Sequence, residues 1–452
     1  MRTSPPSAPP GDWPVFDGAL RTDEGCISAA ADDFGHIVRR RPRAVLEASS
    51  AEDVARLLRH ARHAGLRVSP RGQGHSVYGQ AQTGDGVVVD LCRLDAIYAL
   101  GARTATVGAG LLWSELVRRT LTSGLAPPVL TDYLELSVGG TLSVGGVTGT
   151  SFRFGAQVDQ VEELVVVTGD GDIVTCSERE EPDLFGATLA GLGQVAIIVR
   201  ATVRLVDVTP AVRVFRLWYP DPGVMTADLR ALLFEERFEY LLGIVTPAPE
   251  GGCKASIEGV VSGTDAMPDE ERLAGLGHLR GREELDIRTG EEWTRRVDEP
   301  VAVLQELGLW SSPHPWLDLF VPGSVIDTFL PEVLASPAVE GVGPLRVLLY
   351  PLRTSRFRRP LLRLPAEEIV FLTDVLCTAP PGGAATMVEA NRFLFERNRS
   401  LGGTLYPISA VPLDRADWEG HFGPEWRRLV EAKRRYDPGG ILTPGPGIFP
   451  PA

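Results

Sequence analysis

Hydrophobic and polar residues alternate in short runs through the first half of the chain. The segment that begins at Ser50 starts with a helix-capping residue, continues with Glu52 and Asp53, and then repeats apolar residues at helical spacing. This pattern predicts a helix over 50–64, which Gly65 ends. The neighbouring runs predict a helix at 112–123 and strands at 67–69, 87–91, 104–110, 161–168, 173–176 and 195–206. Short strands interleaved with helices indicate an α+β fold.

The pattern changes at about residue 208, where longer apolar-periodic segments begin. These segments lie at 226–236, 292–306, 320–334 and 387–401, and the strands predicted between them include 240–246, 254–262 and 347–352. The stretch 263–289 is polar and rich in Gly, which is typical of a mobile surface segment. We therefore expect a second α+β domain that carries the substrate pocket. A helix at 426–436 and a tail rich in Gly and Pro follow, and we expect this tail to pack on the rest of the protein.

Length and composition limit the class of protein. A chain of 452 residues exceeds one simple core, so two domains are expected. With 44% hydrophobic and 23% charged residues, the composition is that of a soluble globular protein. The net charge of -14 argues against nucleic acid or an anionic membrane as a partner.

The cysteines and the N-terminal segment predict the compartment. The five cysteines are scattered without metal-ligand or redox spacing, so no metal site is expected and a reduced, cytoplasmic setting fits. Residues 1–14 lack the apolar core of a secretory signal. No run approaches the 18 or so apolar residues that a membrane span requires.

The first unusual stretch is the hexapeptide Arg71-Gly72-Gln73-Gly74-His75-Ser76, between two predicted strands. Its two glycines allow a tight turn with exposed N–H groups, which suits a pyrophosphate. His75 lies between Gly74 and Ser76, so its ring can approach a ligand held by that backbone. The loop does not open a helix, which excludes a dinucleotide fingerprint and a P-loop. On this motif alone, His75 could equally be an ordinary turn histidine.

The second unusual stretch, 131–155, is rich in small residues. It holds Asp132 and the run Gly139-Gly140-Thr141-Leu142-Ser143-Val144-Gly145-Gly146. So many small side chains let the backbone contact a large flat ligand. Close packing of strands in a Gly-rich fold is the alternative explanation.

Taken together, these stretches and several shorter motifs resemble the vanillyl-alcohol-oxidase-type flavoproteins, and within them the cytokinin dehydrogenases. The resemblance runs nearly end to end. The motifs that carry it are residues 71–76 with 79–82, 131–134, 138–145, 166–169 with 174–177, 191–194, 314–317 with 320–322, 350–352, 391–392, and 421–423 through 436–438 to 444–449. The Thr-Asp-Tyr segment at 131–133 and the His-Pro-Trp-Leu segment at 314–317 are characteristic of the cytokinin dehydrogenases.

The resemblance implies a PCMH-type FAD-binding domain of two subdomains with an inserted α+β substrate domain. Residues 1–207 and the returning C-terminal segment 412–452 would form the FAD-binding domain, and 208–411 the substrate-binding domain. It also implies FAD bonded from the His75 ring to the flavin 8α carbon, and neutral imidazole is a good nucleophile. A noncovalent FAD with His75 stacked beside it is the alternative. No cysteine lies in 131–155, so we predict attachment through His75 alone.

The resemblance also implies which residues contact the cofactor. They are Arg71, Gly72, Gln73, Gly74, His75, Ser76, Gln80, Thr131, Asp132, Tyr133, Gly139, Gly140, Thr141, Ser143, Gly145, Gly146, Gly193, Val195, Ile198, Tyr406 and Pro444. For Ile198 the alternative is an ordinary core position.

Asp132 is the predicted catalytic residue. The resemblance places it over the flavin beside the substrate nitrogen, in a largely apolar slot. There its carboxylate would accept the N–H proton while hydride leaves the neighbouring carbon for the flavin. An aspartate that caps a helix or turn is the alternative interpretation.

Three departures from the family pattern concern the substrate and the flavin. Where the plant enzymes have a glutamate expected to face adenine, this chain has Leu242. The aromatic residue after the Tyr-Pro-Leu motif is Phe357 instead of tryptophan, and Pro446 replaces a glutamine that contacts the flavin. Loss of a buried acceptor from a site that reads a purine N–H can weaken binding strongly.

The sequence therefore leaves three hypotheses for the activity. The first is oxidation of a cytokinin such as isopentenyladenine to an imine, which water splits into adenine and an aldehyde, with a quinone-type acceptor or O₂ reoxidising the flavin. The second is the same flavin chemistry on an alcohol, a sugar or a biosynthetic intermediate. The third is a non-catalytic flavin- or ligand-binding protein.

Overall fold

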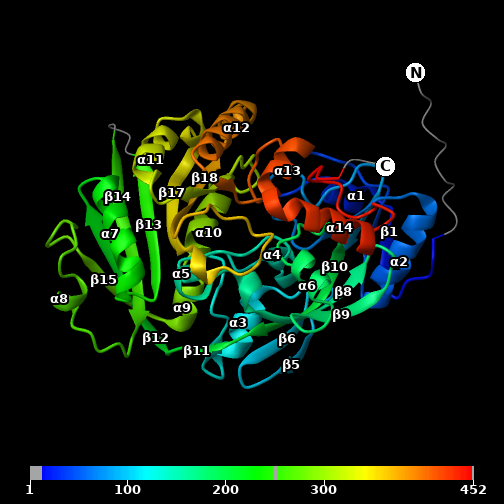
Figure 1. The fold of residues 1–452 in the computed structure, drawn as a ribbon, viewed down its shortest axis with the longest axis horizontal. Helices are drawn as coiled ribbons and strands as arrows, with labels where there is room; N and C mark the ends of the chain where they lie inside the picture. Colours follow the sequence, from blue (N-terminus) through cyan, green and yellow to red (C-terminus); the bar gives the residue numbers. More distant parts are fainter. Residues whose placement is uncertain (1–12, 248–251, 450–452) are drawn as a thin grey trace.

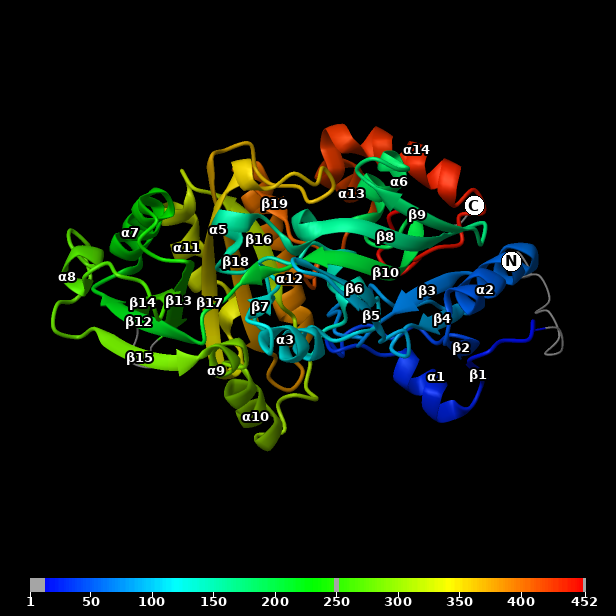
Figure 2. The ribbon, with the colours of Figure 1, turned by 90° about the horizontal axis from the view of Figure 1, so that it is seen from below.

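The computed structural model describes residues 13–247 and 252–449. Most of the N-terminal segment examined for a secretory signal therefore lies outside the described residues. One large sheet lies at one end of the molecule, a four-stranded and a five-stranded sheet lie at the other, and the C-terminal helices lie over these two (Figures 1 and 2). The fourth sheet is the short pair of β7 (Leu125–Ala126) and β11 (Val206–Asp207). This arrangement confirms the predicted α+β class. No helix among the described residues combines the length and the apolarity needed to cross a membrane.

A four-stranded sheet in the order β1-β2-β4-β3 carries the first glycine loop. Its strands are β1 (Ala19–Arg21), β2 (Ala44–Glu47), β3 (Val68–Arg71) and β4 (Val87–Asp90), and helix α1 (Glu24–Ala30) precedes β2. The predicted helix is confirmed as α2 (Ala51–Ala64), with Ser50 as its N-cap and Gly65 in the left-handed conformation at its end. Its apolar face is buried against this sheet, which fixes the strand from which the loop emerges.

A five-stranded antiparallel sheet in the order β5-β6-β10-β8-β9 follows. Its strands are β5 (Ile97–Leu100), β6 (Thr104–Gly108), β8 (Val161–Thr168), β9 (Ile173–Ser177) and β10 (Ala196–Arg204). The helices α3 (Trp113–Leu121), α4 (Val138–Leu142) and α6 (Pro182–Thr188) lie around it, whereas α5 (Ser151–Phe154) packs against β17 (Val342–Arg353) of the largest sheet. The predicted hairpin of β8 and β9 is confirmed. The second glycine-rich stretch forms α4 and the loops beside it, so the alternative of packed strands is wrong there.

An eight-stranded sheet in the order β15-β12-β14-β13-β17-β18-β16-β19 forms the other half. Its strands are β12 (Ala211–Tyr219), β13 (Tyr240–Pro247), β14 (Cys253–Ser262), β15 (Glu284–Thr289), β16 (Leu317–Pro322), β17 (Val342–Arg353), β18 (Ile369–Thr378) and β19 (Thr404–Leu405). One face packs against α7 (Pro222–Glu235), α11 (Ile326–Leu334) and α12 (Ala384–Ser400). The other face shares a core with the five-stranded sheet, so the two halves meet across one continuous apolar layer.

Three predictions in this half are wrong in part. The stretch 263–289 lies mostly at the surface as predicted, but its end is not the mobile segment expected, because it forms β15, which pairs with β12 at the edge of the sheet. The segment 292–306 forms two short helices, α9 (Gly290–Thr294) and α10 (Asp298–Glu306), instead of one. The segment 320–334 begins as β16 and becomes helical only at α11, because a buried strand and a buried helix show the same continuous apolar run.

The C-terminal segment packs on the four-stranded and five-stranded sheets. Helices α13 (Arg415–Phe422) and α14 (Trp426–Tyr436) precede it, and the Lys433 ammonium donates to the carbonyl of Gln194 at 2.8 Å. The backbone N–H of Thr443 donates to the carbonyl of Val68 at 2.9 Å, next to a parallel bridge between Val68 and Leu442. The tail therefore lies against β3, directly before the first glycine loop.

Candidate active site

The first glycine loop leaves β3 with its backbone donors free. Within the described residues, the N–H groups of Gly72, Gln73, Gly74, His75 and Ser76 have no protein acceptor. Successive unpaired N–H groups form a concave site for an anion such as a pyrophosphate. Gly74 has a φ of 68°, in the region that favours glycine.

Two side chains support this loop from behind. The carboxylate of Asp33 accepts from the Ser76 hydroxyl at 3.0 Å and from the Gly79 N–H at 2.7 Å. Burial raises the pKa of Asp33 to about 6. The Arg71 guanidinium lies beneath Gly74 and donates to the carbonyl of Asp32 at 2.6 Å. In this structure the Arg71 side chain therefore holds the loop, whereas the sequence predicted it as a cofactor contact.

His75 lies in an aromatic cluster. Its ring stacks on Phe34 at 4.0 Å and on Tyr133 at 5.0 Å between centroids, and Trp310 and Trp316 lie about its edge. Burial lowers the pKa of His75 to about 3. The imidazole is therefore neutral at physiological pH, which is the form that acts as a nucleophile.

The second glycine stretch lies close to the eight-stranded sheet. Gly146 has a φ of 75° and donates its N–H to the Tyr406 hydroxyl at 2.9 Å. A Cβ on Gly145 would meet the side chains of Leu362 and Tyr406, at 2.9 Å and 3.3 Å. Gly140, on α4, is exposed. The absence of a side chain thus lets the backbone at Gly145 lie close to Leu362 and Tyr406, and the backbone at Gly140 is accessible to a ligand.

The other predicted cofactor residues fall into two groups. Several polar side chains form hydrogen bonds within the protein: Thr131 with the Tyr133 carbonyl, Thr141 with the Val138 carbonyl and the Trp113 indole, Ser143 with the Gly139 carbonyl, and Gln80 with the Tyr78 N–H and the Ser409 carbonyl. The rest lie along β10 and the tail: Gly193 and Val195 are buried just before β10, Ile198 is buried within it, and Pro444 is half-buried. The side chain of Ile198 packs in the shared core, whereas the predicted cofactor contact is one of its backbone.

Asp132 lies at the centre of a polar cluster. Its carboxylate accepts from the Tyr350 hydroxyl at 2.7 Å, the Thr148 hydroxyl at 3.1 Å and the Tyr240 hydroxyl at 3.3 Å. The Arg296 guanidinium forms an ion pair with the same carboxylate. The expected apolar slot is therefore wrong, because Thr148 from the same glycine-rich stretch and three polar side chains from distant segments converge on Asp132.

Arg296 is the member of this cluster that the sequence did not reveal. Its side chain is only 12% exposed, and its guanidinium lies 4.2 Å from the Trp293 ring centroid. Burial, the largest single influence, acts to lower the pKa of Arg296, but Asp132, Tyr240 and Glu258 together outweigh it and the pKa is raised. Arg296 lies between two short surface helices, where an arginine is ordinary, so no sequence signal could have found it. Tyr350 does belong to the Tyr-Pro-Leu motif and could have been found.

Leu242 stands where the plant enzymes have a glutamate that is expected to face adenine, and the structure shows which residues surround it. Leu242 of β13 lies opposite Glu258 of β14, and residues opposite each other in an antiparallel pair project from the same face. Glu258 is largely buried and forms an ion pair with Arg216 at 3.3 Å. A carboxylate thus lies on the strand beside Leu242. Phe357 packs at the border of the shared core.

These features fit the FAD expected from the sequence. The unpaired N–H groups at 72–76 provide an anion site, and the glycines of the second stretch provide a close approach for a flat ring. Between them, Tyr133 contacts His75 while its neighbour Asp132 faces the eight-stranded sheet. A flavin held by both stretches would lie next to a neutral imidazole and a carboxylate.

Two family models match the chain. An FAD binding domain matches residues 42–177, and a second domain, described as cytokinin dehydrogenase 1, FAD and cytokinin binding, matches residues 281–449. Both glycine stretches lie in the first match, and Arg296, Tyr350 and Tyr406 lie in the second.

Relatives match over nearly the whole chain. The uncharacterized oxidoreductase ORF5 in the fasciation locus of Rhodococcoides fascians is 36% identical, over 95% of this chain and 99% of its own. Cytokinin dehydrogenase 7 of Oryza sativa subsp. japonica is 35% identical, over 97% of this chain and 93% of its own.

A crystal structure shows the same fold. The 6-hydroxy-D-nicotine oxidase of Arthrobacter nicotinovorans superimposes with a TM-score of 0.76, covering 96% of this chain and 98% of its own, at 23% identity.

Proposed function

Because the chain belongs to the FAD-dependent oxidoreductases of the cytokinin dehydrogenase family, we propose that it oxidises the C–N bond of a cytokinin-type N6-alkenyl adenine such as isopentenyladenine. The product is an imine, which water splits into adenine and an aldehyde. FAD supplies the oxidising chemistry by accepting a hydride when bound.

The observation that carries this proposal is the polar cluster around Asp132. The cluster lies where the FAD-binding match and the cytokinin-binding match meet, beside the loop of His75. In the proposed mechanism Asp132 accepts the substrate N–H proton as the carbon–nitrogen double bond forms. Tyr350, Tyr240 and Thr148 orient its carboxylate through their hydroxyl groups, and Arg296 balances its charge.

The cofactor residues predicted from the sequence keep their proposed roles, apart from the side chain of Arg71. The backbone of 72–76 binds the pyrophosphate, and Gly139, Gly140, Thr141 and Gly145 line the flavin. His75 forms a single covalent bond to the flavin, and its neutral ring supports this assignment. Residues 1–207 and 412–452 form the FAD-binding domain, and 208–411 form the substrate-binding domain. A quinone-type acceptor or O₂ reoxidises the flavin.

A second candidate function follows from Leu242. An apolar residue at the position expected to read adenine favours another substrate, such as an alcohol or a biosynthetic intermediate, oxidised by the same flavin chemistry. Glu258, on the adjacent strand, favours the cytokinin because it returns a carboxylate to the same face. The non-catalytic alternative gains no support from a site that positions a carboxylate with four polar partners.

The test is anaerobic mixing of the purified yellow protein with isopentenyladenine. We expect the visible flavin absorbance to bleach and adenine to accumulate. A panel of secondary amines and alcohols serves as the comparison. Bleaching by alcohols but not by cytokinins would select the second candidate, and no bleaching by any compound would contradict both.

A further inference from the structure

Two carboxyl groups lie side by side on the face of the eight-stranded sheet that is turned toward Asp132. Asp318 of β16 and Asp374 of β18 are opposite each other in the antiparallel register, and they are 0% and 8% exposed. Within the described residues, the Oδ1 atoms of both groups have no hydrogen-bond partner. Two ionised carboxylates in contact inside a protein repel each other strongly, so such a pair retains at least one proton at neutral pH.

The pair lies in a row of polar groups that begins at Asp132. Strand β17 places Tyr350 opposite Leu372 and Leu348 opposite Asp374, so Tyr350 and Asp374 are diagonal neighbours on one face. The Tyr350 hydroxyl bonds to Asp132. Burial raises the pKa of Asp374 most, and the charges of Asp318 and, to a smaller extent, Asp132 raise it further. Tyr350 therefore adjoins both groups: its hydroxyl binds Asp132, and its position on β17 is diagonal to that of Asp374.

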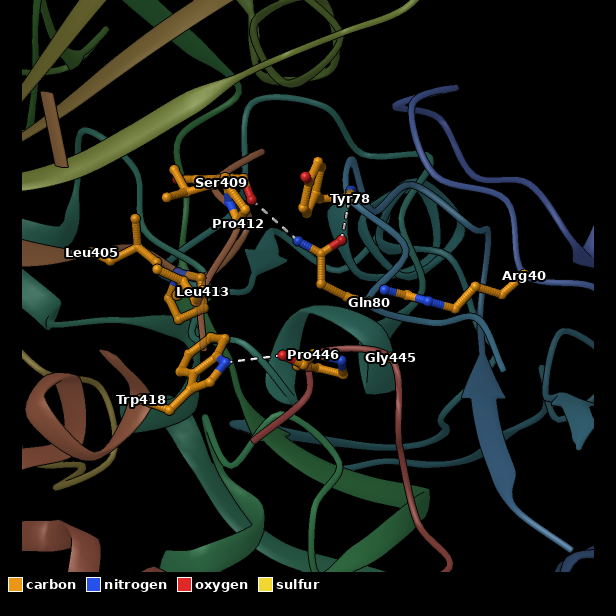
Figure 3. Close-up of a pocket in the computed structure, with 12 residues that line it drawn as sticks. Arg40, Tyr78, Gln80, Leu405, Ser409, Pro412, Leu413, Trp418, Gly445 and Pro446 are labelled. Carbon is orange, nitrogen blue, oxygen red and sulfur yellow. Dashed lines mark hydrogen bonds between the residues drawn. The ribbon is translucent and has the colours of Figure 1, made fainter. Parts of the chain in front are cut away.

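The other end of the row reaches the surface. The Ser409 hydroxyl donates to the Asp318 carbonyl at 3.0 Å and to its Oδ2 atom at 3.4 Å. The Gln80 amide donates to the Ser409 carbonyl at 3.3 Å, and both residues line an open cavity of about 230 Å³ (Figure 3). Water in this cavity would lie one side chain away from Asp318.

Few titratable groups face the pair. They are Asp132 and Tyr350 on one side and Tyr406 after β19 on the other, while Cys377 of β18 lies near Asp318 but on the opposite face of the sheet. Among the described residues, no cation contacts the Asp318–Asp374 pair, whereas Asp132 forms an ion pair with Arg296. Burial raises the pKa of Asp318 to about 7 and that of Asp374 well above its usual range.

We propose that the Asp318–Asp374 pair is the proton acceptor that restores Asp132 in each turnover. This inference rests on the proposed function. Asp132 takes the N–H proton as the double bond forms and the two electrons leave with the hydride. The pair, which holds one proton, then receives the second proton by way of Tyr350. Two neutral carboxyl groups result, and Asp132 is a carboxylate again. The pair releases this proton toward Ser409 and the water of the cavity.

The test uses the FAD-loaded enzyme and the isosteric variants Asp318→Asn and Asp374→Asn. Thr373→Val is the matched control, because Thr373 is buried next to Asp374 and projects from the opposite face of β18. The first readout is the rate of anaerobic flavin bleaching by isopentenyladenine, or by the fastest amine of the panel, as a function of pH. We expect the wild-type rate to fall below about pH 7, where the pair is doubly protonated.

In both Asn variants this pH dependence should shift, because a single buried carboxyl group is left to titrate, and the rate at high pH should fall by about 10²-fold, the lower end for an acid–base group. A purely structural role would change the rate without moving the pH profile. Wild-type pH profiles in both variants would overturn the relay. Absence of bleaching in the wild type itself would overturn the proposed function, and the relay with it.

The second readout needs no turnover. A carboxyl group whose pKa is raised in the folded state makes the protein less stable as the pH rises from the pKa of the unfolded state through that of the folded state. We expect the thermal midpoint of the wild type to fall between about pH 5 and pH 8 relative to both Asn variants, whereas Thr373→Val should follow the wild type. Parallel curves for all four proteins would refute the shared proton.

Discussion

Asp132→Asn removes the proposed base while keeping the shape of the side chain. The side chains of Asp132 and Arg296 are only 20% and 12% exposed, so water screens their ion pair weakly. Breaking a buried pair by removing one partner costs about 3–5 kcal/mol, because the other charge is left uncompensated. The amide oxygen can still accept from Tyr350 at the 2.7 Å position, so we expect a loss near the lower limit, about 3 kcal/mol.

Asp132→Asn should lower the rate of flavin bleaching by more than its loss of stability can explain. A positioned base contributes about 10²–10⁴-fold to the rate, and an amide cannot accept the proton. The assay is the rate of anaerobic flavin bleaching, measured on protein whose flavin content and thermal midpoint are determined in parallel. Bleaching by Asp132→Asn within about tenfold of the wild type would refute the assignment.

Asp159→Asn is the matched control. Asp159 is a buried carboxylate that accepts from the N–H groups of Ala156 and Arg358, away from the polar cluster. It should lower the thermal midpoint and leave the bleaching rate of the folded protein unchanged. If it slowed bleaching as much as Asp132→Asn, general destabilisation would explain both results.

Three further predictions concern the cofactor, the substrate and stability. His75→Ala should release all flavin on acid precipitation, whereas the wild-type pellet should stay yellow; a colourless wild-type pellet would contradict the covalent bond. Leu242→Glu should lower the KM for isopentenyladenine by about tenfold, as a restored hydrogen bond to a charged group would. It should also lower the thermal midpoint, because the new charge lies opposite Glu258; an unchanged KM would argue against adenine at this position. Burial lowers the pKa of His421 to about 3, so this group reduces stability as the pH falls below its unfolded value of about 6.5, by up to about 1.4 kcal/mol per pH unit. His421→Leu should lose less stability than the wild type between about pH 6 and pH 4 in thermal unfolding, and parallel curves would contradict this.

Several features of the fold could be predicted because their signals are local. The cap at Ser50 and the stop at Gly65 directly flank the helix that they delimit, and the hairpin of β8 and β9 is set by a short turn. Predictions failed where tertiary packing decides the structure. The first part of 320–334 is a strand because it pairs with β18 on one side and with β19 on the other, and β15 forms because it pairs with β12 at the edge of the sheet.

The sequence by itself determined the two glycine stretches, the histidine between Gly74 and Ser76, and the aspartate at 132, since glycine spacing constrains the backbone locally. Only the tertiary structure decided what surrounds them. Arg296 reaches Asp132 across 164 positions of the chain, and Asp318 meets Asp374 because β16 pairs with β18. The charge and proton content of such groups depend on burial and on neighbours that are remote in sequence, and only folding brings those neighbours together.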